Sequence, residues 1–119
     1  MIVHEDLPYV KHILDALYDI EDSVEGKSKT AFKKNKDVCD ACIRRLEVIG
    51  EASKNISEQL KKRYPEVVWK RVTGTRDVMI HAYFRVDLDI VWEIIQKDLP
   101  FLKEQMLQIK KDLENKNRS

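Results

Sequence analysis

Apolar residues recur at intervals of three and four along most of the chain, which is the spacing of one buried face on an α-helix. In the first such segment Asp6 stands at a favourable N-cap position, Pro8 falls in the first turn, and Gly26 follows the last apolar residue. The apolar positions are Val10, Ile13, Leu14, Leu17, Ile20 and Val24. The pattern predicts one amphipathic helix between Asp6 and Gly26.

Residues 26–37 break this pattern, because they contain five lysines and a single large apolar residue, Phe32. We expect a loop there, with one helical turn held in place by Phe32. A second helical pattern starts at Val38 and continues to about Ser57. Ser57 is itself a good N-cap, so we expect a separate short helix over the sequence EQLKKRY.

A third segment begins at Pro65, and its apolar residues Val68, Trp69 and Val72 are spaced to pack inward. Gly74 follows them and indicates either a bend or the close approach of another backbone.

The final apolar pattern follows Asp87, a suitable N-cap, and continues to Leu113. Pro100 lies inside it, where a proline removes one backbone hydrogen bond and clashes with the preceding turn. We therefore expect the last helix to kink or split near Asp98.

Together these elements predict an all-α protein, an up-down four-helix bundle with a kinked or split final helix and one short extra helix. The chain has 119 residues with only 3 Gly and 3 Pro, a composition that favours long helices over strands and turns. We expect a single domain over residues 3–113 and a frayed tail over residues 114–119.

The charge balance excludes a general attraction for polyanions, because 22 Lys and Arg face 21 Asp and Glu, giving a formal net charge of +1. Any nucleic-acid binding must come from local basic patches. The chain also lacks an apolar run long enough to span a membrane and a recognisable secretory leader, so we expect a cytoplasmic location and no membrane partner.

Cys39 and Cys42 form a C-x-x-C pair, which raises the question of a zinc or redox site. A zinc site needs two further ligands, and a thioredoxin-like motif needs a preceding strand, whereas this pair continues an apolar helical stripe. We expect reduced thiols at or near the core, with no metal site and no cofactor.

The stretch TRDVMIHAY, residues 75–83, contains four chemically capable side chains. If it is helical, Arg76 and Tyr83 share one face, while Asp77 and His81 share another and can form a hydrogen bond. Arg76 and His81 lie about 140° apart around the axis, so one straight helix does not aim both at a single small target. A second copy of the motif across a dimer interface would supply the missing group.

These residue types fit the cleavage of RNA without a metal ion. A guanidinium binds phosphate oxygens and neutralises charge in a transition state, as Arg76 would do. An imidazole such as His81 transfers protons near neutral pH, with Asp77 fixing its tautomer. The alternative is an ordinary surface pair, because a carboxylate one turn before a histidine is common in helices.

Four stretches of the chain resemble the HEPN superfamily, specifically HepT-like toxins encoded beside a minimal nucleotidyltransferase. RDVMIHAY resembles the superfamily's R-x-x-x-x-H-x-Y signature. The other three are similar to the family's pattern in the same order: IRRLEVIGEASK (43–54), PEVVWKRVTGTRD (65–77) and VDLDIVWEIIQKDLPFL (86–102). The resemblance covers roughly residues 5–110.

The resemblance implies a homodimer in which two signature-bearing helices face one cleft. It implies a metal-independent endoribonuclease with Arg76 and His81 as the catalytic pair, supported by Asp77, where relatives often have Asn. It also implies that a cognate nucleotidyltransferase antitoxin adds AMP to Tyr83 and so blocks the cleft to RNA. Several relatives have been treated as nucleotide-binding subunits, so a non-catalytic binding or docking subunit stays open as the alternative, as does a simple dimeric scaffold.

Further charged residues are secondary candidates. Glu51 is a candidate to anchor the signature helix, and Lys33, Lys34, Lys36 and Arg45 are candidates to contact RNA or the partner protein. The alternative for all five is an ordinary solvated surface of mixed charge.

Overall fold

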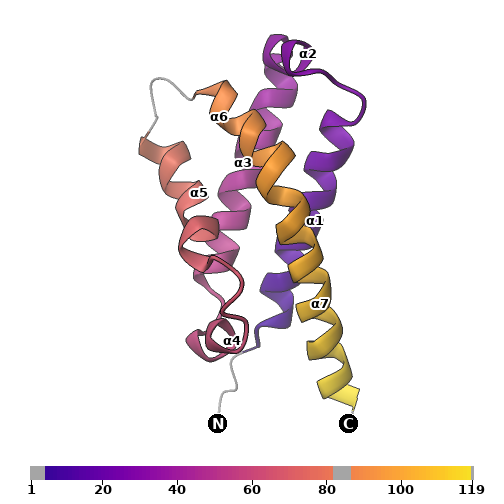
Figure 1. Cartoon of the computed structure of the whole chain (residues 1–119), viewed down its shortest axis with the longest axis vertical. Helices are drawn as coiled ribbons and strands as arrows, with labels where there is room; N and C mark the ends of the chain where they lie inside the picture. Colours follow the sequence, from indigo (N-terminus) through magenta and orange to yellow (C-terminus); the bar gives the residue numbers. More distant parts are fainter. Residues whose placement is uncertain (1–4, 82–86, 119) are drawn as a thin grey trace.

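The computed structural model describes residues 5–81 and 87–118, and it describes side chains for residues 5–75 and 87–116. All regular structure in these ranges is helical, which confirms the predicted all-α class (Figure 1). In chain order the elements are α1 (Leu7–Val24), α2 (Lys29–Lys34), α3 (Lys36–Lys54), α4 (Glu58–Arg63), α5 (Trp69–His81), α6 (Leu88–Glu93), the π-helical segment η1 (Ile94–Asp98) and α7 (Leu99–Arg118).

The four principal helices are α1, α3, α5 and the joined run from α6 through η1 to α7. Figure 1 shows α3 and α1 within the bundle, α7 crossing in front on the right and α5 at the left edge. The core between them is made of aliphatic and small side chains with less than a tenth of their surface exposed, including Val10, Ile13, Leu17, Ile20, Leu46, Ile49, Val91, Met106 and Ile109. The periodic positions read from the sequence are therefore the buried ones.

The start of α1 differs from the prediction. Asp6 occupies the N-cap position, but its side chain makes no capping hydrogen bond to α1. Its carboxylate instead accepts hydrogen bonds from the backbone N–H and the hydroxyl of Ser57, at 2.8 and 2.7 Å. Ser57 in turn caps α4 by accepting from the N–H of Leu60 at 3.1 Å. The carboxylate thus ties the start of α1 to the start of α4, the short helix that the sequence predicted.

The lysine-rich segment contains the helical turn expected there. Ser28 caps α2 by accepting from the N–H of Ala31 at 3.1 Å. Phe32 is fully buried, and its ring centroid lies 5.1 Å from that of Trp92 in α6. The prediction that Phe32 holds this turn against the bundle is confirmed.

The last helix is split close to Asp98, as predicted. In η1 the turns widen, and the N–H of Leu99 donates to the carbonyl of Ile94, five residues earlier. A π-helical turn of this kind accommodates Pro100, which has no N–H and would clash with the turn before it. The helix then continues to Arg118, beyond the expected domain end at residue 113. Fraying of this end in solution stays a prediction.

Both cysteines are free thiols in the core, as predicted. Cys39 donates a hydrogen bond from Sγ to the carbonyl of Phe32 at 3.1 Å. Burial, and then the charge of Asp40, raise the pKa of Cys39. Burial, with a smaller contribution from Cys39, raises the pKa of Cys42 to about 11. Within residues whose side chains are described, no three His, Cys, Asp or Glu side chains are grouped so as to hold a metal ion.

We expect Cys42 to resist alkylation in the folded protein. Because a free thiol has a pKa near ~8.5, the thiolate fraction of Cys42 at pH 8 should be lower by a factor of about 100. The unfolded thiol ionises first, so stability from this group is present below about pH 8.5 and is lost as pH rises toward 11. The measurement is the rate of iodoacetamide labelling by intact mass, with the guanidinium-unfolded chain as control. Equal rates in the two states would contradict the buried position.

In the part of the chain that the structure describes, the helices are too short or too polar to cross a lipid bilayer.

Candidate functional site

Hydroxyl groups fix the signature-bearing helix α5 against α3. Ser53 is fully buried, and its hydroxyl oxygen lies 3.2 Å from that of Thr73, so the two share a hydrogen bond. Thr75 donates to the carbonyl of Val72 at 2.8 Å and also approaches the carbonyl of Leu46 at 3.3 Å. These contacts lie two residues apart on α5 and directly precede the motif, so they set the rotation of this helix about its axis.

The other side of α5 is held by η1 and by the segment before it. Arg71 forms an ion pair with Asp98, with a guanidinium nitrogen 2.9 Å from one carboxylate oxygen. The indole N–H of Trp69 donates to the carbonyl of Tyr64 at 3.1 Å and fixes the first turn. The helix that carries the motif is therefore braced from two neighbouring elements.

The motif itself lies at the end of this braced helix. Arg76, Asp77 and His81 are within α5, so the helical conformation considered for this stretch is found as far as His81. In that conformation Arg76 and His81 diverge by about 140° around the axis. Their side chains and the whole of Tyr83 lie outside the described residues. The convergence of the catalytic pair thus stays a prediction.

Glu51, the proposed anchor for the signature helix, is exposed on α3. It lines a surface hollow together with Tyr9 and His12 of α1. Glu51 follows Leu46 by five positions, about 140° around α3 from the residue whose carbonyl receives Thr75. The described surroundings of Glu51 are therefore on the α1 side of α3, and its anchoring role stays a prediction.

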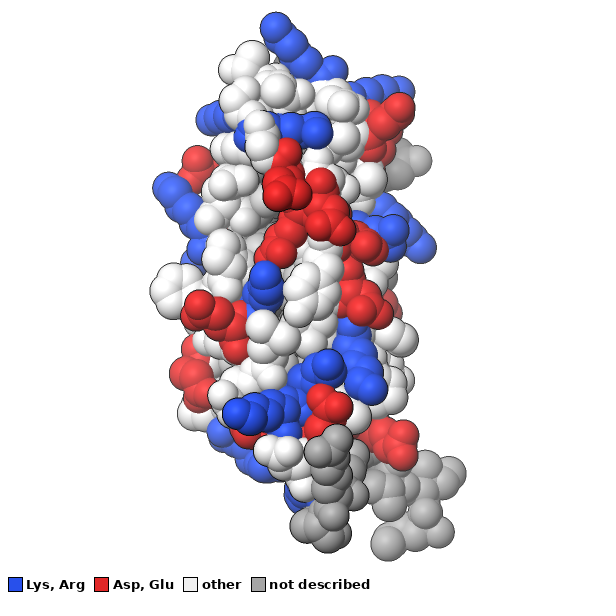
Figure 2. Space-filling model, turned by 90° about the vertical axis from the view of Figure 1, so that its right-hand side faces the viewer, with Lys and Arg blue, Asp and Glu red and all other residues white. Residues whose placement is uncertain are grey.

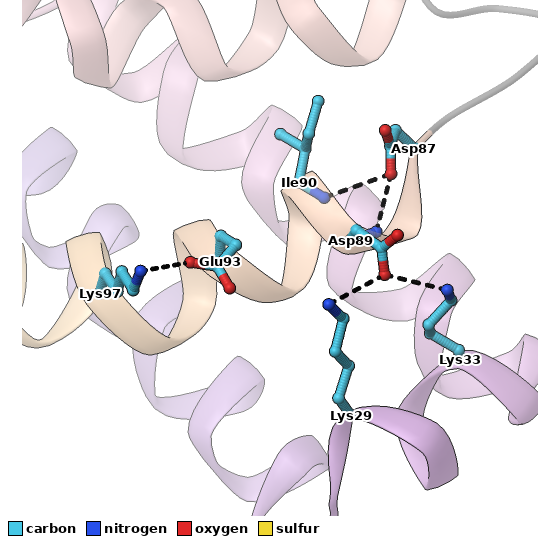
Figure 3. A network of polar contacts seen from close by, with 7 residues as sticks. All are labelled: Lys29, Lys33, Asp87, Asp89, Ile90, Glu93 and Lys97. Atoms are coloured by element: carbon cyan, nitrogen blue, oxygen red, sulfur yellow. Dashed lines mark hydrogen bonds and ion pairs between the residues drawn. The ribbon is translucent and has the colours of Figure 1, made fainter.

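Lys33 takes part in a network at the start of α6 that braces α2 (Figure 3). Asp89 accepts from Lys33 at 2.9 Å, and the ammonium of Lys29 lies 3.2 Å from the same oxygen. Hydrogen bonds from Lys33 and then Lys29 lower the pKa of Asp89. Asp87 caps α6 by accepting from the N–H groups of Asp89 and Ile90 at 2.9 and 3.4 Å. Lys33 is thus engaged within the chain rather than presented alone to a partner.

The remaining basic candidates are divided. Lys34 and Lys36 are exposed, whereas Arg45 lies 3.4 Å from Asp19 and bridges α3 to α1. Such exposed ion pairs contribute little stability, about 0–1 kcal/mol, so an RNA phosphate can compete for these cations. Their contact with RNA or a partner stays a prediction.

The face of the molecule that carries α7 offers no continuous basic track. Figure 2 shows this side, turned away from α5, with acidic side chains gathered across its middle and basic ones towards both ends. A nucleic-acid backbone along this face would cross the acidic zone, where like charges repel. The electrostatics of this face do not favour RNA there.

The sequence did not identify the hydroxyl contacts that orient α5. Ser53 falls on the apolar stripe of α3, in register with Leu46, Ile49 and Ile56. A polar residue at a core position needs a hydrogen-bond partner, so this mismatch was the available signal. The partner, Thr73, could not be chosen from the sequence because it depends on how the two helices pack.

Fold and motif together define a class of protein: a helical bundle whose α5 carries an arginine and a histidine five positions apart. Residues 13–109 match the family described as "Ribonuclease HepT-like". The chain therefore belongs to the HepT-like ribonuclease family, and the resemblance seen in the sequence is confirmed.

Curated relatives support this assignment. The chain is 38% identical over 108 residues to "Probable ribonuclease HepT" of Thermococcus cleftensis, covering 91% of this chain and 96% of the relative. It is 39% identical over 102 residues to "Putative RNase TTE0752" of Caldanaerobacter subterraneus, covering 86% and 91%.

A relative from Methanocaldococcus jannaschii, "Gamma-glutamylcyclotransferase and putative RNase MJ0434", is 42% identical over 110 residues. That match covers 92% of this chain but 50% of the relative, so the chain spans half the length of that protein. No solved structure matches the chain.

Proposed function

We propose that the protein is a homodimeric, metal-independent endoribonuclease that acts in the cytoplasm as the toxin of a toxin–antitoxin pair. The observation that carries this proposal is the family's R-x-x-x-x-H spacing on one braced helix, α5, in a chain that belongs to the HepT-like ribonucleases. Since Arg76 and His81 diverge on a single helix, the active cleft requires two copies of the motif.

The proposed chemistry is transesterification within RNA. His81 accepts the proton of a ribose 2′-hydroxyl, whose oxygen attacks the adjacent phosphorus. The bond from phosphorus to the 5′ oxygen breaks, that oxygen takes up a proton, and a 2′,3′-cyclic phosphate remains. Arg76 binds the phosphate oxygens, where negative charge increases in the transition state. Asp77 orients the imidazole.

We further propose that a cognate nucleotidyltransferase acts as antitoxin by transferring AMP to Tyr83. Tyr83 follows His81 by two residues, so a nucleotide attached there adds bulk and phosphate charge next to the cleft. RNA is then excluded by steric overlap and by repulsion between phosphates.

The test uses the purified chain and end-labelled RNA in the presence of EDTA. Cleavage to cyclic phosphate ends is expected, with loss of activity after co-expression with the neighbouring nucleotidyltransferase. Intact mass should show added AMP units, and Tyr83→Phe should abolish them and keep cleavage.

A second candidate is a non-catalytic nucleotide-binding or docking subunit. The observation in its favour is the negative charge that Asp77 places within the motif, close to where an RNA phosphate would bind. In that case no RNA product appears at any protein concentration, while Arg76→Ala still lowers nucleotide affinity.

A further inference from the structure

The helix α5 presents one face that no described helix covers. Lys70, Gly74, Asp77 and His81 follow one another at intervals of four, three and four, so these positions share a single face. The opposite side of α5 packs on the bundle, where Val72 is 8% exposed. Figure 1 shows α5 at the left edge, without a further described helix outside it.

Gly74 is the unexplained residue on this face. A Cβ built at Gly74 would meet no atom within 4 Å, and the residue has ordinary helical backbone. Glycine destabilises a helix interior relative to alanine, and nothing within the chain needs the missing side chain. The close approach predicted at this glycine is therefore not made within one chain, which leaves an approach from outside.

We propose that a second copy of this chain packs against the face of α5 that is centred on Gly74, with the two α5 helices crossing antiparallel at that glycine. This inference rests on the proposed dimeric nuclease and adds the contact surface. Glycine at a crossing point lets two helix backbones come close, because no side chain separates them.

Charge supports a second copy as the occupant. A two-fold axis at Gly74 places each residue before it opposite the residue equally far after it. Lys70, which is exposed, then lies opposite position 78 and next to Asp77 of the other copy, and the same contact occurs twice. The face is therefore complementary to itself in charge. An RNA backbone on this face would instead meet two repelling carboxylates.

The crossing also explains how the motif is completed. Gly74 precedes Arg76 by two residues and His81 by seven, so two helices that cross there bring both copies of the motif to one interface. Arg76 and His81, which diverge within one helix, can then contribute to a shared cleft from different copies.

The first test is Gly74→Ala, which should act in opposite directions on folding and on assembly. Thermal unfolding at concentrations where the protein is monomeric should occur at a higher temperature, because the added methyl group has space and alanine favours the helix. Sedimentation equilibrium should show dimer dissociation at least about 10-fold stronger. An unchanged dissociation constant would overturn the proposal, including the case in which only RNA cleavage falls.

The second test is a charge exchange. Lys70→Asp and Asp77→Lys should each weaken the dimer, and the double variant should regain most of the lost affinity. Lys111→Asp, a matched change at an exposed position of α7, should have no effect. A double variant no tighter than either single variant would overturn the proposed crossing.

Sedimentation separates this inference from the proposed nuclease, because it requires no RNA. Assembly that responds as expected in a chain that cleaves no RNA would contradict the nuclease and keep the interface. RNA cleavage by a dimer that is indifferent to all four changes would contradict the interface and keep the nuclease.

Discussion

His81→Ala is expected to lower the rate of RNA cleavage by at least about 100-fold, because general acid–base catalysis contributes roughly 10²–10⁴. Arg76→Ala should have a loss of about 10²–10³, because it removes the cation that binds the phosphate in the transition state. The measurement is the single-turnover rate on end-labelled RNA in EDTA.

The matched control is His12→Ala, which removes an exposed histidine on α1 and should leave the rate unchanged. Circular dichroism and sedimentation must show that each variant is folded and assembled like the original protein. Undiminished cleavage by folded His81→Ala protein would remove the proposed general base.

Phe32→Ala is expected to produce the largest loss of stability, about 3–5 kcal/mol in the free energy of unfolding. The ring is fully buried and stacks near Trp92, so its removal leaves a cavity where α2 meets the bundle. The measurement is equilibrium unfolding in urea.

Phe101→Ala provides the comparison, because Phe101 is 72% exposed and its loss should change stability by less than about 0.5 kcal/mol. Similar losses in the two variants would mean that Phe32 does not hold α2 in the core.

The fold was predictable where one residue determines local structure. The three-four spacing of apolar residues gave the buried faces of α1, α3 and α7, since burial follows helical periodicity directly. Ser57 gave the start of α4, and Pro100 gave the split after η1, since a cap and a missing N–H act within one turn.

Contacts between distant segments were not predictable in the same way. The carboxylate of Asp6 had a choice between the N–H groups of its own helix and the N–H and hydroxyl of Ser57, 51 residues away, and the second arrangement is found. Lys33 and Arg45 were considered for external partners, but each has a carboxylate nearby from another helix. Only the packing of the bundle brings those groups together.

The candidate site shows the same division. Arg76, Asp77 and His81 could be selected from the sequence because a motif of this kind is contiguous and its helical conformation is local. The contacts that orient it, from Ser53 to Thr73 and from Thr75 to Leu46, join two helices and required the structure.

Complementation between two inactive variants tests most directly whether the active cleft is shared. Arg76→Ala and His81→Ala chains, each inactive alone, are mixed by unfolding and refolding together, or co-expressed with different tags. A mixed dimer keeps one arginine and one histidine on different chains, so cleavage should return to about a quarter of the original rate at equal mixing, since half the dimers are mixed and each has one intact cleft. A mixed dimer that forms but cleaves no RNA would contradict the shared cleft.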